Sequence, residues 1–196
     1  MLLALHGFTE SDLTWREVLG GMTTDLICPL LPGHGWKPCP DSLSVPGLAD
    51  TLATSSQLGN APVDVLGYSM GGRIALALAL RHPQRVRRLV LVSSGPGFKD
   101  QALQGSRRTV EMAMAETLED DGLGPFVAMW EKNPILTPYK RLPRALEEDM
   151  RARRLNHDPL GLAAALRQLG AGAMPNLWND LPKLRVPTLL LAGEVD

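Results

Sequence analysis

The stretch that decides the fold lies near the middle of the chain and reads Val63-Asp64-Val65-Leu66-Gly67-Tyr68-Ser69-Met70-Gly71-Gly72-Arg73-Ile74-Ala75-Leu76-Ala77-Leu78-Ala79-Leu80. A short apolar run passes directly into Gly-x-Ser-x-Gly and then into helix-forming residues, a pattern that predicts a strand, a sharp turn and a helix. A serine on such a turn projects its hydroxyl above the sheet, and the flanking glycines let the backbone approach closely. Ser69 is therefore predicted to be an activated serine at a nucleophile elbow.

A second cluster lies at the start of the chain, where the apolar residues 1–5 lead into His6-Gly7-Phe8-Thr9. In serine hydrolases of the α/β type, a loop at this place donates one backbone N–H to an oxyanion, and the residue after the serine donates the other. The N–H groups of Phe8 and Met70 are therefore predicted to form an oxyanion hole. His6 is interpreted as a residue that packs this loop and not as the base.

Length and composition limit the classes of protein to which this chain can belong. The chain has 196 residues, 44% of them hydrophobic, and a formal net charge of −1, so it can bury a sizeable core as one domain. No segment is basic enough to predict a nucleic-acid partner, and the longest apolar runs are strand-sized, so we expect neither a membrane span nor a signal peptide. Cys28 and Cys39 are too few for a disulfide framework or a metal site. We expect a cytoplasmic protein with reduced thiols.

The first half of the chain alternates strand patterns with helical patterns. Strands are predicted over residues 1–5, 25–28, 63–66 and 88–92, and helices over residues 14–19, 47–58 and 72–82. This order predicts an α/β fold, with a mostly parallel sheet and helices on both faces. His34 in a glycine-flanked turn and His82 before a proline are interpreted as structural residues.

The pattern changes after residue 98. Up to about residue 181 the chain shows only helical periodicity, interrupted by glycines and prolines, before a strand pattern returns at residues 188–191. We therefore predict a core formed by residues 1–98 and 181–196 and a helical cap formed by residues 99–180. Because ligands of parallel sheets bind beyond the carboxyl ends of the strands, the cap is expected to cover Ser69 and shape the substrate pocket.

These motifs together resemble the α/β-hydrolase superfamily. The matching segments are the loop after the first strand, Leu31-Pro32-Gly33-His34-Gly35, the elbow through Arg73, and Gly193-Glu194-Val195-Asp196. Within the superfamily, the cap is similar to that of the menaquinone-pathway synthases of the MenH type, which form 2-succinyl-6-hydroxy-2,4-cyclohexadiene-1-carboxylate. The cap segments that carry this resemblance are Arg107-Arg108, residues 126–132, 154–156 and 166–172, Pro175 and residues 177–178.

The resemblance implies a lyase that uses hydrolase machinery without a cofactor or metal. Ser69 is then the base that removes a proton, a histidine polarises Ser69, and Asp196 orients that histidine. The reaction expels pyruvate from a succinylated enolpyruvyl cyclohexene carboxylate, so the partner is a small anionic molecule. Tyr68 and Trp130 are predicted to line the pocket, with a place in the core as the alternative for each.

The same resemblance implies cationic partners for the carboxylates of the substrate. Arg73, one arginine of the pair Arg107 and Arg108, and Arg154 match the carboxylate-binding positions of the family. A guanidinium one turn after the elbow can bind a carboxylate through two hydrogen bonds. For Arg107 or Arg108 taken alone, a place on a solvated helix face is the alternative.

The chain departs from the family pattern in two places. It stops at Asp196, whereas the triad histidine of the superfamily follows a further strand beyond the acid. The carboxyl-terminal strand and helix are therefore expected to be absent, and exposed sheet surface favours a monomer prone to association or a homodimer. All four histidines precede Asp196, and His157 in the cap is weighed as a substitute base.

The second departure is Glu10, which stands where the family has a glycine. If Glu10 faces the pocket, it argues against a substrate with three carboxylates, and an outward orientation leaves that substrate open. Three functions are open at this point. The first is the lyase, and the second is a carboxylic ester hydrolase in which Ser69 forms an acyl-enzyme. The third is a triad-incomplete, inactive form of the fold.

Overall fold

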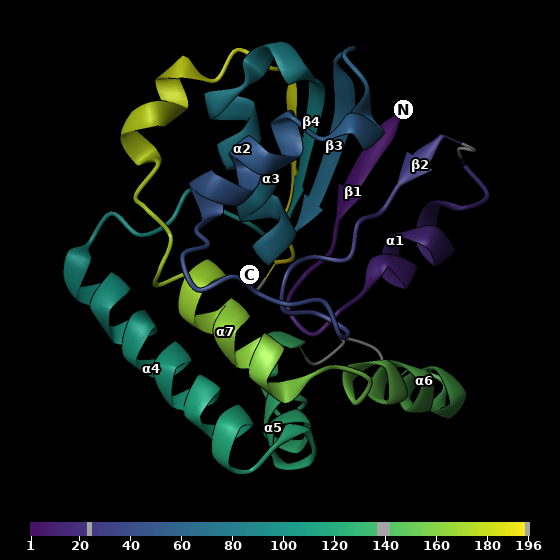
Figure 1. The fold of residues 1–196 in the computed structure, drawn as a ribbon, viewed down its shortest axis with the longest axis vertical. Helices are drawn as coiled ribbons and strands as arrows, with labels where there is room; N and C mark the ends of the chain where they lie inside the picture. The colour runs from purple at the N-terminus through teal and green to yellow at the C-terminus, as the bar shows by residue number, and fades with distance from the viewer. Residues whose placement is uncertain (23–24, 137–141, 195–196) are drawn as a thin grey trace.

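The computed structural model describes residues 1–22, 25–136 and 142–194, and a five-stranded sheet lies at its centre (Figure 1). Neighbouring strands pair in parallel, in the order β2-β1-β3-β4-β5. The strands are β1 Leu2–Leu5, β2 Leu26–Ile27, β3 Val63–Tyr68, β4 Val86–Val92 and β5 Thr188–Leu191. The parallel sheet predicted from the alternating pattern is confirmed.

Helices cover both faces of this sheet. They are α1 Asp12–Leu19, α2 Val45–Ala53 and α3 Met70–Arg81, with 3₁₀ turns η1 Ser56–Leu58 and η2 Pro83–Arg85. Successive side chains of a strand point to opposite faces, so Leu3 of β1 joins the cluster that contains α2 and α3. Its neighbour Ala4 faces the other way and packs in a second cluster with Trp15 of α1. The prediction of helices on both faces is confirmed.

One helix differs from its prediction. The pattern over residues 47–58 forms α2 and then the separate turn η1. The helix begins earlier than predicted because Ser44 caps it, its hydroxyl accepting a hydrogen bond from Gly47 N at 3.2 Å. It ends before Thr54, whose hydroxyl bonds back to a carbonyl of the last turn and so competes with further helix.

Helices α4 to α7 lie beyond the carboxyl ends of β3 and β4 (Figure 1). Their bounds are α4 Gln101–Asp120, α5 Leu123–Trp130, α6 Arg144–Arg154 and α7 Pro159–Leu169, with turns η3 Pro134–Leu136 and η4 Trp178–Lys183. The long helix α4 packs along α7, and each begins at an aspartate cap, Asp100 and Asp158. This position is the one expected for the predicted cap. The boundaries of the cap at residues 99 and 180 stay a prediction. No helix in the described ranges is long and apolar enough to cross a membrane.

Strand β5 forms one edge of the described sheet. The side chains of Leu189, Leu190 and Leu191 are exposed. The monomer or homodimer expected from the sequence stays a prediction.

Gly71 occupies a position in the elbow that has no room for a side chain. A Cβ atom built on Gly71 lies 2.3 Å from the Leu5 carbonyl oxygen, whereas one built on Gly105 of α4 meets nothing within 4 Å. We expect Gly71→Ala to lower the free energy of unfolding by about 2 kcal/mol, because β1 must shift. Gly105→Ala, the matched control, should raise it by up to about 1 kcal/mol, since alanine favours helix. Urea denaturation measures both changes, and equal effects would contradict the prediction.

Candidate active site

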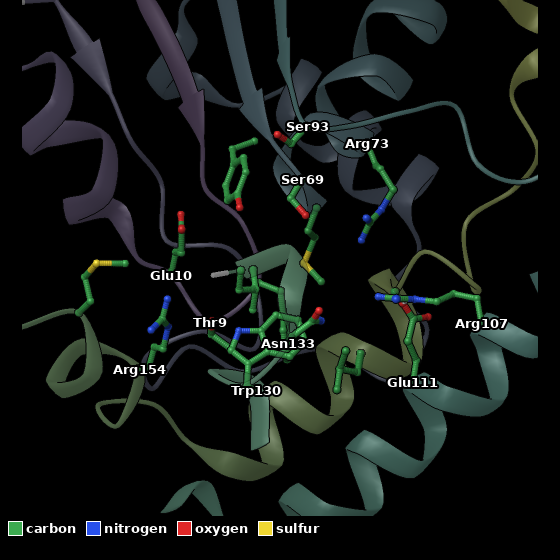
Figure 2. Close-up of a pocket in the computed structure, with 17 residues that line it drawn as sticks. Thr9, Glu10, Ser69, Arg73, Ser93, Arg107, Glu111, Trp130, Asn133 and Arg154 are labelled. Carbon is green, nitrogen blue, oxygen red and sulfur yellow. The ribbon is translucent and has the colours of Figure 1, made fainter. Parts of the chain in front are cut away.

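Ser69 lies between β3 and α3 in the positive-φ conformation of a tight elbow, with φ 49° and ψ −112°. Such a conformation costs a non-glycine residue roughly 1–3 kcal/mol and persists only where the surroundings enforce it. Here Ser69 N donates to the Val92 carbonyl at 2.9 Å, and the Ser94 hydroxyl donates to the Ser69 carbonyl at 2.9 Å. The Ser69 side chain makes no capping hydrogen bond to α3. Its hydroxyl points instead into the space between the sheet and helices α4 to α7 (Figure 2).

That space is a cavity of about 380 Å³, and Ser69 is one of its lining residues. The carboxyl ends of β3 and β4 form one wall, and the cap helices form the other. Its lining is Phe8, Thr9, Glu10, Tyr68, Ser69, Met70, Arg73, Ser93, Arg107, Glu111, Trp130, Asn133, Leu136, Met150, Arg154, Leu166 and Gly170. The fold thus brings together residues from seven separate parts of the chain around one serine hydroxyl.

Phe8 and Met70, the predicted oxyanion donors, both line this pocket. Met70 is the first residue of α3, where backbone N–H groups have no partner within the helix. The loop that holds Phe8 is tied down by Trp15, whose Nε1 donates to the last carbonyl of β1 at 2.9 Å. The Phe8 ring packs edge-to-face against Trp130, with 5.4 Å between the ring centres. Both residues therefore border the space beside the elbow, and their role as donors stays a prediction.

Arg73 extends into the pocket from the first turn of α3 (Figure 2). Its Nη2 donates to the Leu169 carbonyl at 3.1 Å, whereas its Nε is buried without a hydrogen-bond partner among the described residues. Burial lowers the pKa of Arg73 to about 10, and the nearby Glu111 carboxylate opposes that shift. Because a buried N–H without a partner costs free energy, an anionic ligand that bonds to it would be stabilised here.

Arg107 and Arg108 are separated by the structure. Arg107 lines the pocket, and its Nε donates to Glu111 Oε1 at 2.8 Å. Glu111 is 1% exposed and also accepts hydrogen bonds from Ala171 N and Gly172 N, at 2.8 and 2.9 Å. Arg108 instead turns its guanidinium to a carbonyl of α7 and is absent from the described lining. Of the pair, Arg107 is thus the one whose position suits a substrate carboxylate.

Arg154 and Glu10 lie together on the opposite side of the pocket from Arg73 (Figure 2). Arg154 Nη1 donates to Glu131 Oε1 at 3.1 Å. Glu10 Oε2 accepts a hydrogen bond from Gly7 N at 3.4 Å. Burial raises the pKa of the Glu10 carboxyl, and the Gly7 hydrogen bond and the Arg154 charge partly offset that shift. Glu10 therefore faces the pocket, which is the orientation that weakens binding of a substrate with three carboxylates.

Comparison with known proteins identifies the family. The model of the alpha/beta hydrolase family matches residues 2–196. The chain belongs to the alpha/beta hydrolase family. A Bacillus subtilis protein provisionally named a 2-succinyl-6-hydroxy-2,4-cyclohexadiene-1-carboxylate synthase is 35% identical over the whole of this chain, which spans 73% of that protein.

Two solved structures extend the comparison. MenH from Staphylococcus aureus is 36% identical with a TM-score of 0.91, and the match covers all of this alpha/beta hydrolase and 75% of the MenH chain. A malate-bound thermophilic esterase from Thermogutta terrifontis is 27% identical with a TM-score of 0.74, covering 98% of this chain and 71% of the esterase. The resemblance to synthases of the MenH type, drawn from the cap segments, is confirmed.

Tyr68 and Trp130 both line the pocket of this alpha/beta hydrolase. Trp130 also stacks on Phe126, with 5.8 Å between ring centres, so it belongs to the pocket and to the packed core at once. Sequence reasoning missed Ser93 and Asn133, which line the pocket as well. A signal existed for Ser93, because it directly follows β4, and the ends of parallel strands meet at one edge of a sheet. Nothing in the local sequence marked Asn133.

The histidines of the described chain have structural partners. His6 Nε2 accepts from Leu31 N at 3.0 Å, and His82 Nε2 lies 2.6 Å from Asp50 Oδ1. His157 Nδ1 accepts from Gly35 N at 2.6 Å, and its Nε2 lies 3.2 Å from the Thr9 carbonyl. No histidine is among the described residues that line the pocket, so the geometry gives no support to His157 as a substitute base. Asp196 lies outside the described residues, and its role stays a prediction.

Burial of His6 predicts a loss of stability in acid. The ring is 0% exposed, and burial lowers the pKa of His6 from 6.5 to about 4. Between pH 6.5 and 4 the unfolded chain binds a proton at His6 that the folded chain does not. The free energy of unfolding is therefore highest above pH 6.5 and falls as the pH is lowered from 6.5 to 4. We expect this to cost about 3 kcal/mol of unfolding free energy. Urea titrations across this range measure the loss. His6→Gln should reduce this loss of unfolding free energy, and a loss equal to that of the wild type would contradict the assignment.

Proposed function

We propose that this alpha/beta hydrolase is a carbon–oxygen lyase of menaquinone biosynthesis, which eliminates pyruvate from a succinylated enolpyruvyl cyclohexene carboxylate. The observation that carries the proposal is the presence of Arg73 and Arg107 together on one side of the pocket that Ser69 lines, with Arg154 on the opposite side. Guanidinium groups are the side chains best suited to bind carboxylates in fixed geometry. The similarity to synthases with this activity in their names supports the same substrate class.

In the proposed mechanism, the Ser69 oxygen accepts a proton from a ring carbon. The electron pair left behind forms a ring double bond as the carbon–oxygen bond to the enolpyruvyl group breaks, and the enolate that departs takes up a proton to become pyruvate. The N–H groups of Phe8 and Met70 would stabilise the oxyanion charge that develops during proton removal. A histidine oriented by Asp196 would polarise Ser69. The arginines hold the substrate so that the reacting carbon faces the serine.

Release of pyruvate from the pathway substrate tests this proposal. We would compare this chain with a version extended past Asp196 through a strand and a histidine. Pyruvate from the extended form alone would support the lyase and make the present chain a triad-incomplete form. Pyruvate from both would support the lyase and remove the need for that histidine. Release from neither, with each protein folded, would contradict the proposal.

A carboxylic ester hydrolase is the second candidate, and the inward orientation of Glu10 favours it. A carboxylate in the pocket opposes a substrate that carries several negative charges, whereas a neutral ester meets no such repulsion. Ser69 would then attack the ester carbonyl and form an acyl-enzyme, which water hydrolyses. Turnover of small neutral esters by a protein that releases no pyruvate would favour this function over the lyase.

A further inference from the structure

The charged side chains of the pocket form two groups (Figure 2). Arg73 and Arg107 lie on one side with Glu111, so that side holds two guanidiniums against one carboxylate. Glu10 and Arg154 lie on the other side, which holds one of each. The two sides therefore offer a carboxylate of the ligand different electrostatic surroundings.

Arg154 has a carboxylate partner independent of Glu10. Its Nη1 donates to Glu131 Oε1 at 3.1 Å, and the Arg154 side chain is only 16% exposed. Glu131 also pairs with Arg151, and it is not among the described residues that line the pocket. Arg154 thus shares the Glu131 carboxylate with Arg151, and Glu10 adds a second carboxylate that lines the pocket, so two carboxylates stand against these two guanidiniums.

The Glu10 carboxylate is held in place by its own loop. Glu10 N donates to the Gly7 carbonyl at 3.3 Å, and Gly7 N donates to Glu10 Oε2 at 3.4 Å. The preceding residue, Thr9, is buried with φ 64°, and its carbonyl lies 3.2 Å from His157 Nε2. Backbone and side chain together keep the carboxylate at the pocket wall, because turning it away would break the Gly7 contact.

We propose that Glu10 is a specificity-determining residue, whose carboxylate disfavours a second ligand carboxylate beside Arg154 and favours a neutral hydrogen-bond donor there. This role rests on the proposed function, since it concerns an anionic ligand whose first carboxylate binds at Arg73 and Arg107. Two like charges brought together in a partly buried site repel strongly. A hydroxyl group of the ligand instead donates a charge-assisted hydrogen bond to the same carboxylate.

Two probes that differ by a single carboxylate test this role. The first is 2-succinylbenzoate, a stable aromatic dicarboxylate with the succinyl and carboxylate groups of the synthase product but not its hydroxyl, and the second is 3-benzoylpropanoate, which lacks the ring carboxylate. Equilibrium binding is measured by calorimetry, so the result does not depend on turnover. We expect Glu10→Gln to raise the affinity for the dicarboxylate about tenfold and to change that for the monocarboxylate less than about twofold. Glu10→Gly should change the ratio of the dicarboxylate affinity to the monocarboxylate affinity by the same factor. Agreement of the two variants would show that the effect comes from loss of the carboxylate and not from the glutamine side chain.

Glu17→Gln is the matched control, because it removes an equal charge from an exposed site. Glu17 accepts a hydrogen bond from Arg153 at 2.7 Å and does not belong to the described lining. We expect it to leave the affinity ratio unchanged. A ratio unaffected by Glu10→Gln, or shifted equally by Glu17→Gln, would overturn the role of Glu10 while leaving the lyase intact. Binding of neither probe to any variant would overturn both proposals.

Discussion

Replacement of Ser69 by alanine is expected to lower the rate of pyruvate release at least about 1,000-fold, with the fold intact. In the proposed mechanism Ser69 is the group that accepts the proton, and its hydroxyl points into the pocket from the elbow between β3 and α3. Alanine keeps the backbone contacts with Val92 and Ser94, so the elbow should persist without its oxygen. Initial rates with the pathway substrate, measured on the form that releases pyruvate, give the effect.

Ser106→Ala is the matched control for this change. Ser106 lies on exposed α4, where its hydroxyl donates to the Ala102 carbonyl at 2.9 Å, and it does not line the described pocket. Its loss should leave the rate within about twofold of the wild type, because surface substitutions of this kind have small effects. Retention of most activity by Ser69→Ala, with unchanged circular dichroism, would remove Ser69 from the chemistry and with it both proposed functions.

The parts of the fold that were predictable are those governed by local sequence. The glycine pattern around Ser69 specifies a turn that few sequences can form, and the elbow lies where that pattern places it. The strand predicted over residues 88–92 was found as Val86–Val92, since the continuous apolar run over residues 89–92 sets the centre of the strand better than its ends. The predicted start of α2 at residue 47 was wrong, because the Ser44 cap begins the helix at Val45.

The candidate site was predictable to the extent that its residues adjoin the elbow. Arg73 lies one turn from Ser69, so helix geometry alone directs it toward the pocket. Arg107 and Arg108 are neighbours on α4, and only the packing of α4 against α7 decides which of them faces inward. Glu111 and Asn133 could not be recognised, because their place in the pocket depends on contacts between segments far apart in the chain.

The electrostatics of the pocket also follow from packing and not from composition. A net charge of −1 over the whole chain gives no indication of a site with three guanidiniums. Burial of Arg73 and Arg154 strengthens their interactions with a charged ligand, because a low local dielectric increases electrostatic interactions. Partial burial likewise strengthens the repulsion between the Glu10 carboxylate and a negatively charged group of the ligand. Charge selection at this site thus depends on a few buried side chains whose positions the sequence does not encode locally.

Replacement of Arg73 by alanine is expected to raise KM for the anionic substrate about 100-fold while changing KM for a small neutral ester less than about twofold. A buried, charge-assisted hydrogen bond to a carboxylate contributes about 2–3 kcal/mol, which corresponds to that factor. The buried Nε of Arg73, unpartnered among the described residues, is the donor that a ligand carboxylate would satisfy. Initial-rate measurements with both substrates separate the loss of charge recognition from general damage to the pocket.

Arg108→Ala provides the control, because it removes the same side chain from a position outside the described lining. Its effect on KM should stay within about threefold for either substrate. If Arg73→Ala weakens both substrates equally, Arg73 supports the shape of the pocket and not the recognition of a carboxylate. The lyase would then lose the residue that most directly links Ser69 to an anionic substrate, and the ester hydrolase would become the better account of this pocket.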